Sequence, residues 1–145
     1  IARARLGNID YALEKISEYW GGMLERGATS FWEAYDPEQR GPEQYAYYGR
    51  PYAKSLSHAW SSGPAAILPS QILGLRPLED GWKRFSLAPD LGSLDWVSVS
   101  VPTPQGMLTV DVENGRISVN IPKGAIMELY GEEFSGPQTF RRKLK

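Results

Sequence analysis

The feature that most constrains the fold is the dipeptide Asn114-Gly115. Asn-Gly is the favoured pair for a two-residue type I′ turn, which joins two antiparallel strands into a β-hairpin. Counting outward from this turn places apolar residues opposite apolar residues on one face, and polar residues on the other. The aligned pairs are Glu113 with Arg116, Val112 with Ile117, Val110 with Val119, and Leu108 with Ile121.

The chain after Pro77 is rich in residues that favour β-strands, in short runs bounded by Gly, Pro or Asn. Several short strands at close spacing are typical of a β-sandwich or jelly roll. We therefore predict a small antiparallel β-sandwich over residues 76–145. The expected strands are Trp82–Leu87, Trp96–Val101, Met107–Glu113, Arg116–Ile121 and Ala125–Tyr130.

The chain before Gly74 has the pattern of helices and loops instead. Over residues 9–26, apolar residues recur at steps of three and four, which predicts an amphipathic helix with Asn8 as its N-cap and Gly27 as its stop. Residues 28–56 have no clean period and are punctuated by Gly and Pro, as in a functional loop. Residues 57–73 look helical again, with a kink or a break expected at Pro64 and Pro69.

Composition excludes several kinds of site. The absence of cysteine rules out disulfides and thiolate metal sites, and a single histidine makes a zinc site improbable, so we expect no metal and no cofactor. The net charge is -1, and the basic tail at 141–145 is the sort of charged terminus that is usually only solvated, so we expect no nucleic-acid partner. No apolar run is long enough to span a bilayer, so no membrane association is expected. The compartment is left open.

Two acidic residues, Glu33 and Asp36, lie among aromatic residues directly after the first predicted helix. Eight of the seventeen aromatic residues fall between Phe31 and Trp60. Such a surface suits a sugar, and an apolar surround raises a carboxyl pKa toward the range useful for proton transfer. Composition alone favours the alternative, a packed aromatic core with exposed acids. His58 is likewise more often a structural residue than a catalytic one when it stands alone.

Three stretches of the chain resemble α-L-rhamnosidases of glycoside hydrolase family 78. Residues 19–33, which end in Ala-Thr-Ser-Phe-Trp-Glu, and residues 55–64, Ser-Leu-Ser-His-Ala-Trp-Ser-Ser-Gly-Pro, are similar to the end of the catalytic barrel in that family. Residues 72–89 resemble the passage into its C-terminal β domain, and 102–106 resemble a turn inside that domain. The resemblance keeps its order from residue 19 to residue 112.

The resemblance implies a fold and a function. It implies α + β architecture, with residues 1–75 forming the last helices of an (α/α)6 catalytic barrel and residues 76–145 the β-sandwich. It implies hydrolysis of terminal α-L-rhamnosyl bonds with inversion, in which Glu33 matches the general base. His58 matches a histidine of the rhamnose pocket, and Trp32 supplies an apolar wall for the sugar. The general acid lies in an upstream part of the barrel, which is the expected partner besides a rhamnose-containing glycoside, and the chain alone is expected to be inactive.

Two other functions stay open at this point. One is a non-catalytic carbohydrate-binding module that uses the aromatic loop. The other is an (α/α)6-barrel hydrolase or phosphorylase that acts on a different sugar.

Overall fold

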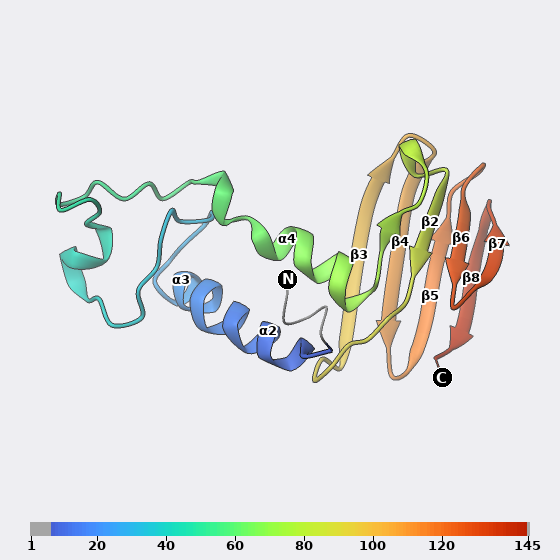
Figure 1. The fold of residues 1–145 in the computed structure, drawn as a ribbon, viewed down its shortest axis with the longest axis horizontal. Coiled ribbons are helices and arrows are strands. Elements are labelled where there is room, and N and C mark those ends of the chain that lie inside the picture. Colours follow the sequence, from blue (N-terminus) through green and yellow to red (C-terminus); the bar gives the residue numbers. More distant parts are fainter. Residues whose placement is uncertain (1–6, 145) are drawn as a thin grey trace. The chain divides into compact units, whose positions relative to one another are not determined.

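The computed structural model describes residues 7–144, which divide between Ile67 and Leu68 into two compact units (Figure 1). The first unit holds helices and a long loop, and the second holds two β-sheets preceded by a short helical turn. The chain is therefore an α + β protein. Within residues 7–144, every helix falls short of the length and apolarity that a membrane crossing demands.

The first helical segment covers the range predicted from the sequence, but it is not uniform. It runs as α2 (Ile9–Ile16), a π-helical turn η1 (Ser17–Gly21) and α3 (Gly22–Glu25). The Asn8 side chain accepts a hydrogen bond from the backbone N–H of Tyr11, which confirms it as the N-cap. Gly27 has a φ of 82°, and the following N–H reaches back to the carbonyl of Met23, so the helix ends in a Schellman motif.

Gly22 allows an aromatic ring to approach the helix closely. A Cβ at this position would lie 2.5 Å from Cζ of Tyr35, which is far inside contact distance. Tyr35 also packs edge-on against Tyr19, with ring centroids 6.3 Å apart. The loop after the helix therefore lies directly on the helix surface, and it does so because position 22 has no side chain.

Arg26, at the end of the first helical segment, holds part of the long loop by hydrogen bonds. The guanidinium donates to the carbonyl of Gln39 at 2.6 Å, to Oε1 of Gln44 at 2.9 Å and to the carbonyl of Pro37 at 3.3 Å. The loop carries two 3-10 turns, η2 (Gly41–Tyr45) and η3 (Ala59–Ser61). The unit ends with the short helix α4 (Gly63–Ile67).

The break predicted in the second helical stretch is present. The α-helical part ends at Ile67, and the second unit opens with a π-helical turn, η4 (Leu68–Ile72). Pro64 lies at the start of α4, where its missing N–H costs no helix hydrogen bond, and Pro69 lies in the irregular turn.

The second unit contains two four-stranded sheets. One has the strand order β1-β2-β6-β7 and the other β3-β4-β5-β8, and η5 (Asp80–Trp82) connects β1 to β2. The strands are β1 (Arg76–Pro77), β2 (Arg84–Leu87), β3 (Trp96–Thr103), β4 (Gly106–Glu113), β5 (Arg116–Ile121), β6 (Ile126–Leu129), β7 (Glu132–Ser135) and β8 (Gln138–Lys143).

The predicted hairpin is confirmed. Val112 pairs with Ile117 and Val110 pairs with Val119, as the alignment from the turn requires. Asn114 and Gly115 have φ values of 50° and 67°, the positive angles of a type I′ turn. All the apolar residues of the inner face are at most 1% exposed, so the register and the burial agree.

Both sheets contribute to one hydrophobic core, as in a β-sandwich. The sheet of β1, β2, β6 and β7 supplies Phe85, Leu87, Met127 and Leu129, each at most 1% exposed. The other sheet supplies the inner face of the hairpin, and Leu73 and Leu75 join from the segment before β1. Alternation of buried and exposed residues along β2, β5 and β6 produces this arrangement.

One expectation about the sheets is wrong. The sandwich is not wholly antiparallel, because β2 and β6 pair in parallel. They can do so because residues 88–125, which include the whole β3-β4-β5 meander, form the long crossover that a parallel pair needs. The basic residues Arg141, Arg142 and Lys143 lie in β8, an edge strand paired with β5, and Arg141 and Lys143 are exposed there. Charged side chains are common on edge strands because they discourage further pairing.

Candidate active site

Glu33 lies half-buried at the point where two distant parts of the first unit meet. Its backbone N–H donates to the carbonyl of Ser55 at 2.8 Å, and the N–H of Ser55 donates to the Glu33 Oε2 at 3.0 Å. The pair of bonds fixes both the backbone and the carboxylate of Glu33. One carboxylate oxygen is thereby oriented by a backbone donor, as expected of a positioned acid and not of a freely rotating surface one.

The segment 55–61 runs alongside residues 30–33 and holds them by further hydrogen bonds. The N–H of His58 donates to the carbonyl of Phe31 at 2.7 Å, and the hydroxyl of Ser30 donates to the carbonyl of Leu56. The indole N–H of Trp60 donates to the carbonyl of Glu33 at 3.0 Å. The two segments that carry Glu33 and His58, separated in sequence by the long loop, are therefore neighbours in space.

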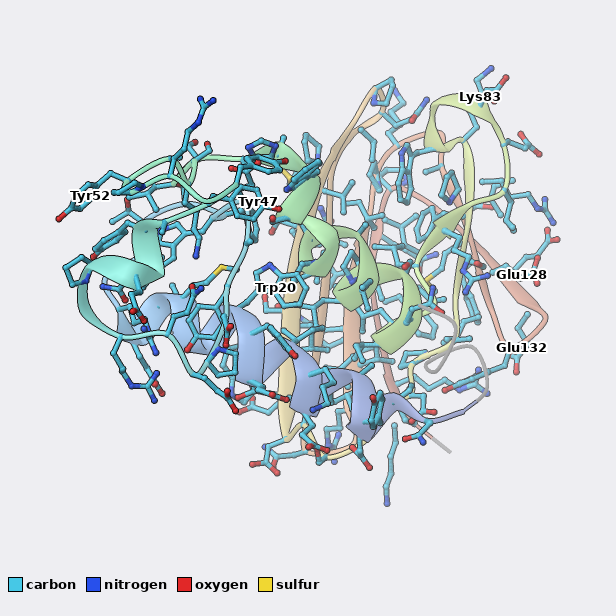
Figure 2. The ribbon with its side chains drawn as sticks, turned by 60° about the vertical axis from the view of Figure 1, so that its left-hand side comes forward. Trp20, Tyr47, Tyr52, Lys83, Glu128 and Glu132 are labelled. Atoms are coloured by element: carbon cyan, nitrogen blue, oxygen red, sulfur yellow. The ribbon has the colours of Figure 1, made fainter. Side chains whose placement is uncertain are left out.

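The first helical segment also holds residues 55–61 in place. Trp20 donates its indole N–H to the carbonyl of Ser61 at 2.7 Å, and the Ser61 hydroxyl donates to the carbonyl of Glu33 at 3.3 Å. Figure 2 shows Trp20 on the first helical segment, with Tyr47 and Tyr52 on the loop that follows. Hydrogen bonds to this helix thus restrain the backbone of Glu33 through the 55–61 segment.

His58 and Trp60 form an aromatic pair beside Glu33. Their ring centroids are 4.4 Å apart, and the two planes are tilted by 46°. His58 is half-buried, whereas Trp60 is 64% exposed. The imidazole is therefore packed on one side by an indole and still reaches the surface.

Trp32 occupies a different environment from the one expected of a pocket wall. It is 3% exposed, and its ring packs against Tyr45 at a centroid distance of 5.9 Å. Tyr45 in turn stacks on Tyr52 at 6.3 Å. In the first unit, Trp32 is thus part of an aromatic cluster that supports the loop.

Asp36 is exposed and has a local structural partner. Its Oδ1 accepts a hydrogen bond from the backbone N–H of Glu38 at 2.9 Å, the pattern of an Asx turn. The carbonyl of Asp36 also accepts from the N–H of Gln39. The structure therefore separates the two candidate acids: Glu33 is tied to the segment of His58, and Asp36 shapes a turn.

Lys54 is a buried cation that the sequence did not single out. It is 7% exposed, and its ammonium donates to Oε1 of Gln39 at 3.4 Å. Burial lowers the pKa of Lys54, because the charged form loses its hydration. The negative charges of Asp36 and Glu33 act in the opposite direction, whereas Arg26 adds to the lowering.

The described part of the chain, residues 7–144, contains no group of three or more His, Asp or Glu side chains placed to hold a metal ion. The chemistry that these residues offer is that of one positioned carboxylate, one imidazole and several aromatic rings.

Trp60 and Lys54 were missed as site residues because their environment depends on contacts between segments far apart in the sequence. The only signal for Trp60 was its place in the Ser-His-Ala-Trp stretch.

Residues 74–131 match the family model of the bacterial alpha-L-rhamnosidase C-terminal domain. No curated protein sequence matches the chain.

Several solved structures resemble the chain. The GH78 family rhamnosidase of Bacillus sp. GL1 is 30% identical, with a TM-score of 0.65 over 88% of this chain and 13% of that one. The native α-L-rhamnosidase of Aspergillus terreus is 22% identical, with a TM-score of 0.65 over 85% of this chain and 16% of that one. The α-L-rhamnosidase of Streptomyces avermitilis, solved with L-rhamnose, is 17% identical, with a TM-score of 0.59 over 76% of this chain and 11% of that one.

The first two structural matches cover more of the chain than residues 74–131, so the similarity of fold extends into the first unit. Together the matches relate the chain to glycoside hydrolases. The relatives matched are α-L-rhamnosidases, and the resemblance read from the sequence is confirmed. The chain spans only a small part of these relatives, between 11% and 16% of their length in the three structures described.

Proposed function

We propose that this chain is part of an inverting glycoside hydrolase that cleaves terminal α-L-rhamnosyl residues, and that it contributes the general base, Glu33. The observation that carries the proposal is the fixed Glu33 carboxylate, held by the N–H of Ser55 on the same segment that bears His58. The matches to α-L-rhamnosidases supply the reaction class.

In this proposal, residues 1–75 are the last helices of an (α/α)6 catalytic barrel and residues 76–145 are its C-terminal β domain. The helices of the first unit cannot close a twelve-helix barrel. The remaining helices and the general acid are therefore assigned to an upstream part of the parent protein. The substrate is a rhamnose-containing glycoside or polysaccharide, and the bound L-rhamnose in the Streptomyces avermitilis structure supports this substrate class.

The mechanism requires two carboxyl groups on opposite sides of the sugar. One acid protonates the departing oxygen, and the other carboxylate removes a proton from the attacking water, with the two groups about 6.5–9.5 Å apart to leave room for that water. Glu33 suits the second role because a backbone N–H holds one of its oxygens. A carboxylate fixed in this way has a restricted set of orientations, so the water that it binds is also positioned.

His58 and Trp32 have supporting roles in the proposal. His58 donates or accepts a hydrogen bond with a rhamnose hydroxyl, which its half-buried position beside Glu33 favours. Trp32 is proposed as an apolar wall of the pocket. Its 3% exposure limits this role to a small part of the side chain.

The test is a comparison of Glu33→Gln with Asp36→Asn in the full-length protein, with a nitrophenyl α-L-rhamnoside as substrate. Glutamine keeps the size of Glu33 and cannot accept the proton, so kcat should fall by about 10²–10⁴-fold while substrate binding survives. Asp36→Asn is the matched control, since that side chain is exposed and accepts a backbone hydrogen bond in a turn. A Glu33→Gln enzyme with nearly normal kcat, or a larger loss in Asp36→Asn, would overturn the assignment.

A further inference from the structure

Two tryptophans stand beside the proposed general base, and their exposure is opposite. Trp32 is 3% exposed, whereas Trp60 is 64% exposed. A large apolar ring left open to water beside a half-buried acidic residue is the kind of surface that a ligand covers. The ring of Trp60, and not that of Trp32, is free to make such a contact in this unit.

The exposed ring of Trp60 is also fixed in place. Its Nε1 donates to the carbonyl of Glu33 at 3.0 Å, and its centroid lies 4.4 Å from that of His58. The hydrogen bond satisfies the only polar atom of the indole, so the rest of the ring presents apolar surface. Because the ring is held before any ligand arrives, little side-chain freedom is lost on binding.

We propose that Trp60 is a sugar-stacking residue of the rhamnose site, in which its exposed indole surface receives the C–H face of a pyranose ring beside Glu33 and His58. This inference rests on the proposed function and adds a residue to that site. A deoxy sugar such as rhamnose carries a methyl group besides its ring C–H groups, which gives it an unusually apolar side. The imidazole of His58, which packs against the indole, and the carboxylate of Glu33 serve the hydroxyls.

The two features of Trp60 can be separated by substitution. Trp60→Leu removes the flat aromatic surface and the N–H together. Trp60→Phe removes the N–H to the Glu33 carbonyl but keeps an aromatic face. If stacking is the function, Phe restores most of the affinity for the sugar, and any loss of the N–H appears instead in kcat, because the backbone of Glu33 is less well held.

The experiment uses the full-length protein and measures the inhibition constant of free L-rhamnose together with KM and kcat for a nitrophenyl α-L-rhamnoside. Trp60→Leu should weaken L-rhamnose binding by about tenfold, the low end of the effect of removing an aromatic ring that stacks on a nucleic-acid base, and Trp60→Phe by no more than about twofold. The matched control is Trp96→Leu, because Trp96 is 63% exposed on β3 in the second unit and should leave all three constants unchanged.

A measurement on the unsubstituted enzyme tests the same contact without depending on whether the Trp60→Leu variant folds. Tryptophan labelled with fluorine reports on ring contacts by NMR, and Trp60→Phe assigns the resonance. L-rhamnose should shift the Trp60 resonance and leave that of Trp96 in place.

Three results would overturn the inference. The Trp60 resonance does not shift at saturating L-rhamnose, or a folded Trp60→Leu variant binds L-rhamnose as tightly as the parent enzyme. The third is a Trp60→Phe variant that binds L-rhamnose as weakly as Trp60→Leu does. If Glu33→Gln loses kcat while Trp60→Leu keeps its affinity, only the stacking role fails. If Trp60→Leu loses affinity while Glu33→Gln stays active, only the general-base assignment fails.

Discussion

Substitution of Gly115 should weaken the β4–β5 hairpin through backbone conformation alone. Gly115 has a φ of 67°, and an added Cβ would find nothing within 4 Å, so a side chain there meets no neighbour. The cost comes from placing an L-residue in the left-handed region, about 1–2 kcal/mol for an ordinary side chain. A β-branched residue such as valine is disfavoured there most strongly.

These considerations give an ordered series. Gly115→Asn should be nearly neutral, because asparagine tolerates positive φ. Gly115→Ala should cost about 1 kcal/mol and Gly115→Val about 2 kcal/mol. Asn114→Gly, at the neighbouring position with a φ of 50°, should cost nothing or stabilise slightly, and it serves as the control for substitution at the turn itself.

The assay is amide hydrogen exchange of the folded protein, followed by mass spectrometry of the proteolytic peptides that cover residues 106–121. A loss of 2 kcal/mol corresponds to about thirtyfold faster exchange of the hairpin amides when exchange follows local opening. The reasoning is refuted if Gly115→Val exchanges like the parent, or if asparagine destabilises as much as valine does. Either result would mean that positive φ is not what the turn requires.

Three further outcomes are expected. In the full-length protein, His58→Ala should raise KM for a nitrophenyl α-L-rhamnoside by about tenfold with a smaller change in kcat, and unchanged kcat/KM would make His58 purely structural. Lys54→Met should raise the melting temperature at pH 7, because it removes a buried charge. Between the lowered pKa of Lys54 in the folded state and its unfolded value near 10.5, the unfolded parent protein binds more protons than the folded one, so the parent gains stability as pH rises. The difference in melting temperature between Lys54→Met and the parent should therefore shrink over that range. A difference that does not change with pH would contradict this. The 145-residue chain alone should give no turnover above a heat-treated control, and measurable turnover would contradict the assignment of the general acid to an upstream segment.

The parts of the fold that were predictable depend on short-range patterns. Asn114-Gly115 determines its own backbone geometry, and the alternation on either side fixes the register, so the hairpin followed from local chemistry. The cap at Asn8 and the stop at Gly27 are equally local. Each of these features can be inferred without knowing what lies elsewhere in the chain.

The parts that were missed depend on distant partners. The strands β7 and β8 carry charges because they lie at or near sheet edges, so their apolar alternation is weak. The alternation along β2 and β6 is the same for a parallel as for an antiparallel pair, so it does not indicate that they pair in parallel. At the candidate site, the motif residues indicated Glu33 and His58, but the bond from Ser55 to Glu33 and the exposure of Trp60 required the structure.

The parallel pair of β2 and β6 has a consequence for the order in which this unit assembles on the ribosome. The β3-β4-β5 meander has only neighbouring strands to find, so it can form as soon as residues 96–121 have emerged. β2 is synthesised earlier and must wait for β6, with Phe85 and Leu87 exposed in the meantime. We therefore expect the sheet around β2 to be completed more slowly than the meander, and lengthening the segment between β2 and β3 should delay it more than the same insertion between β6 and β7.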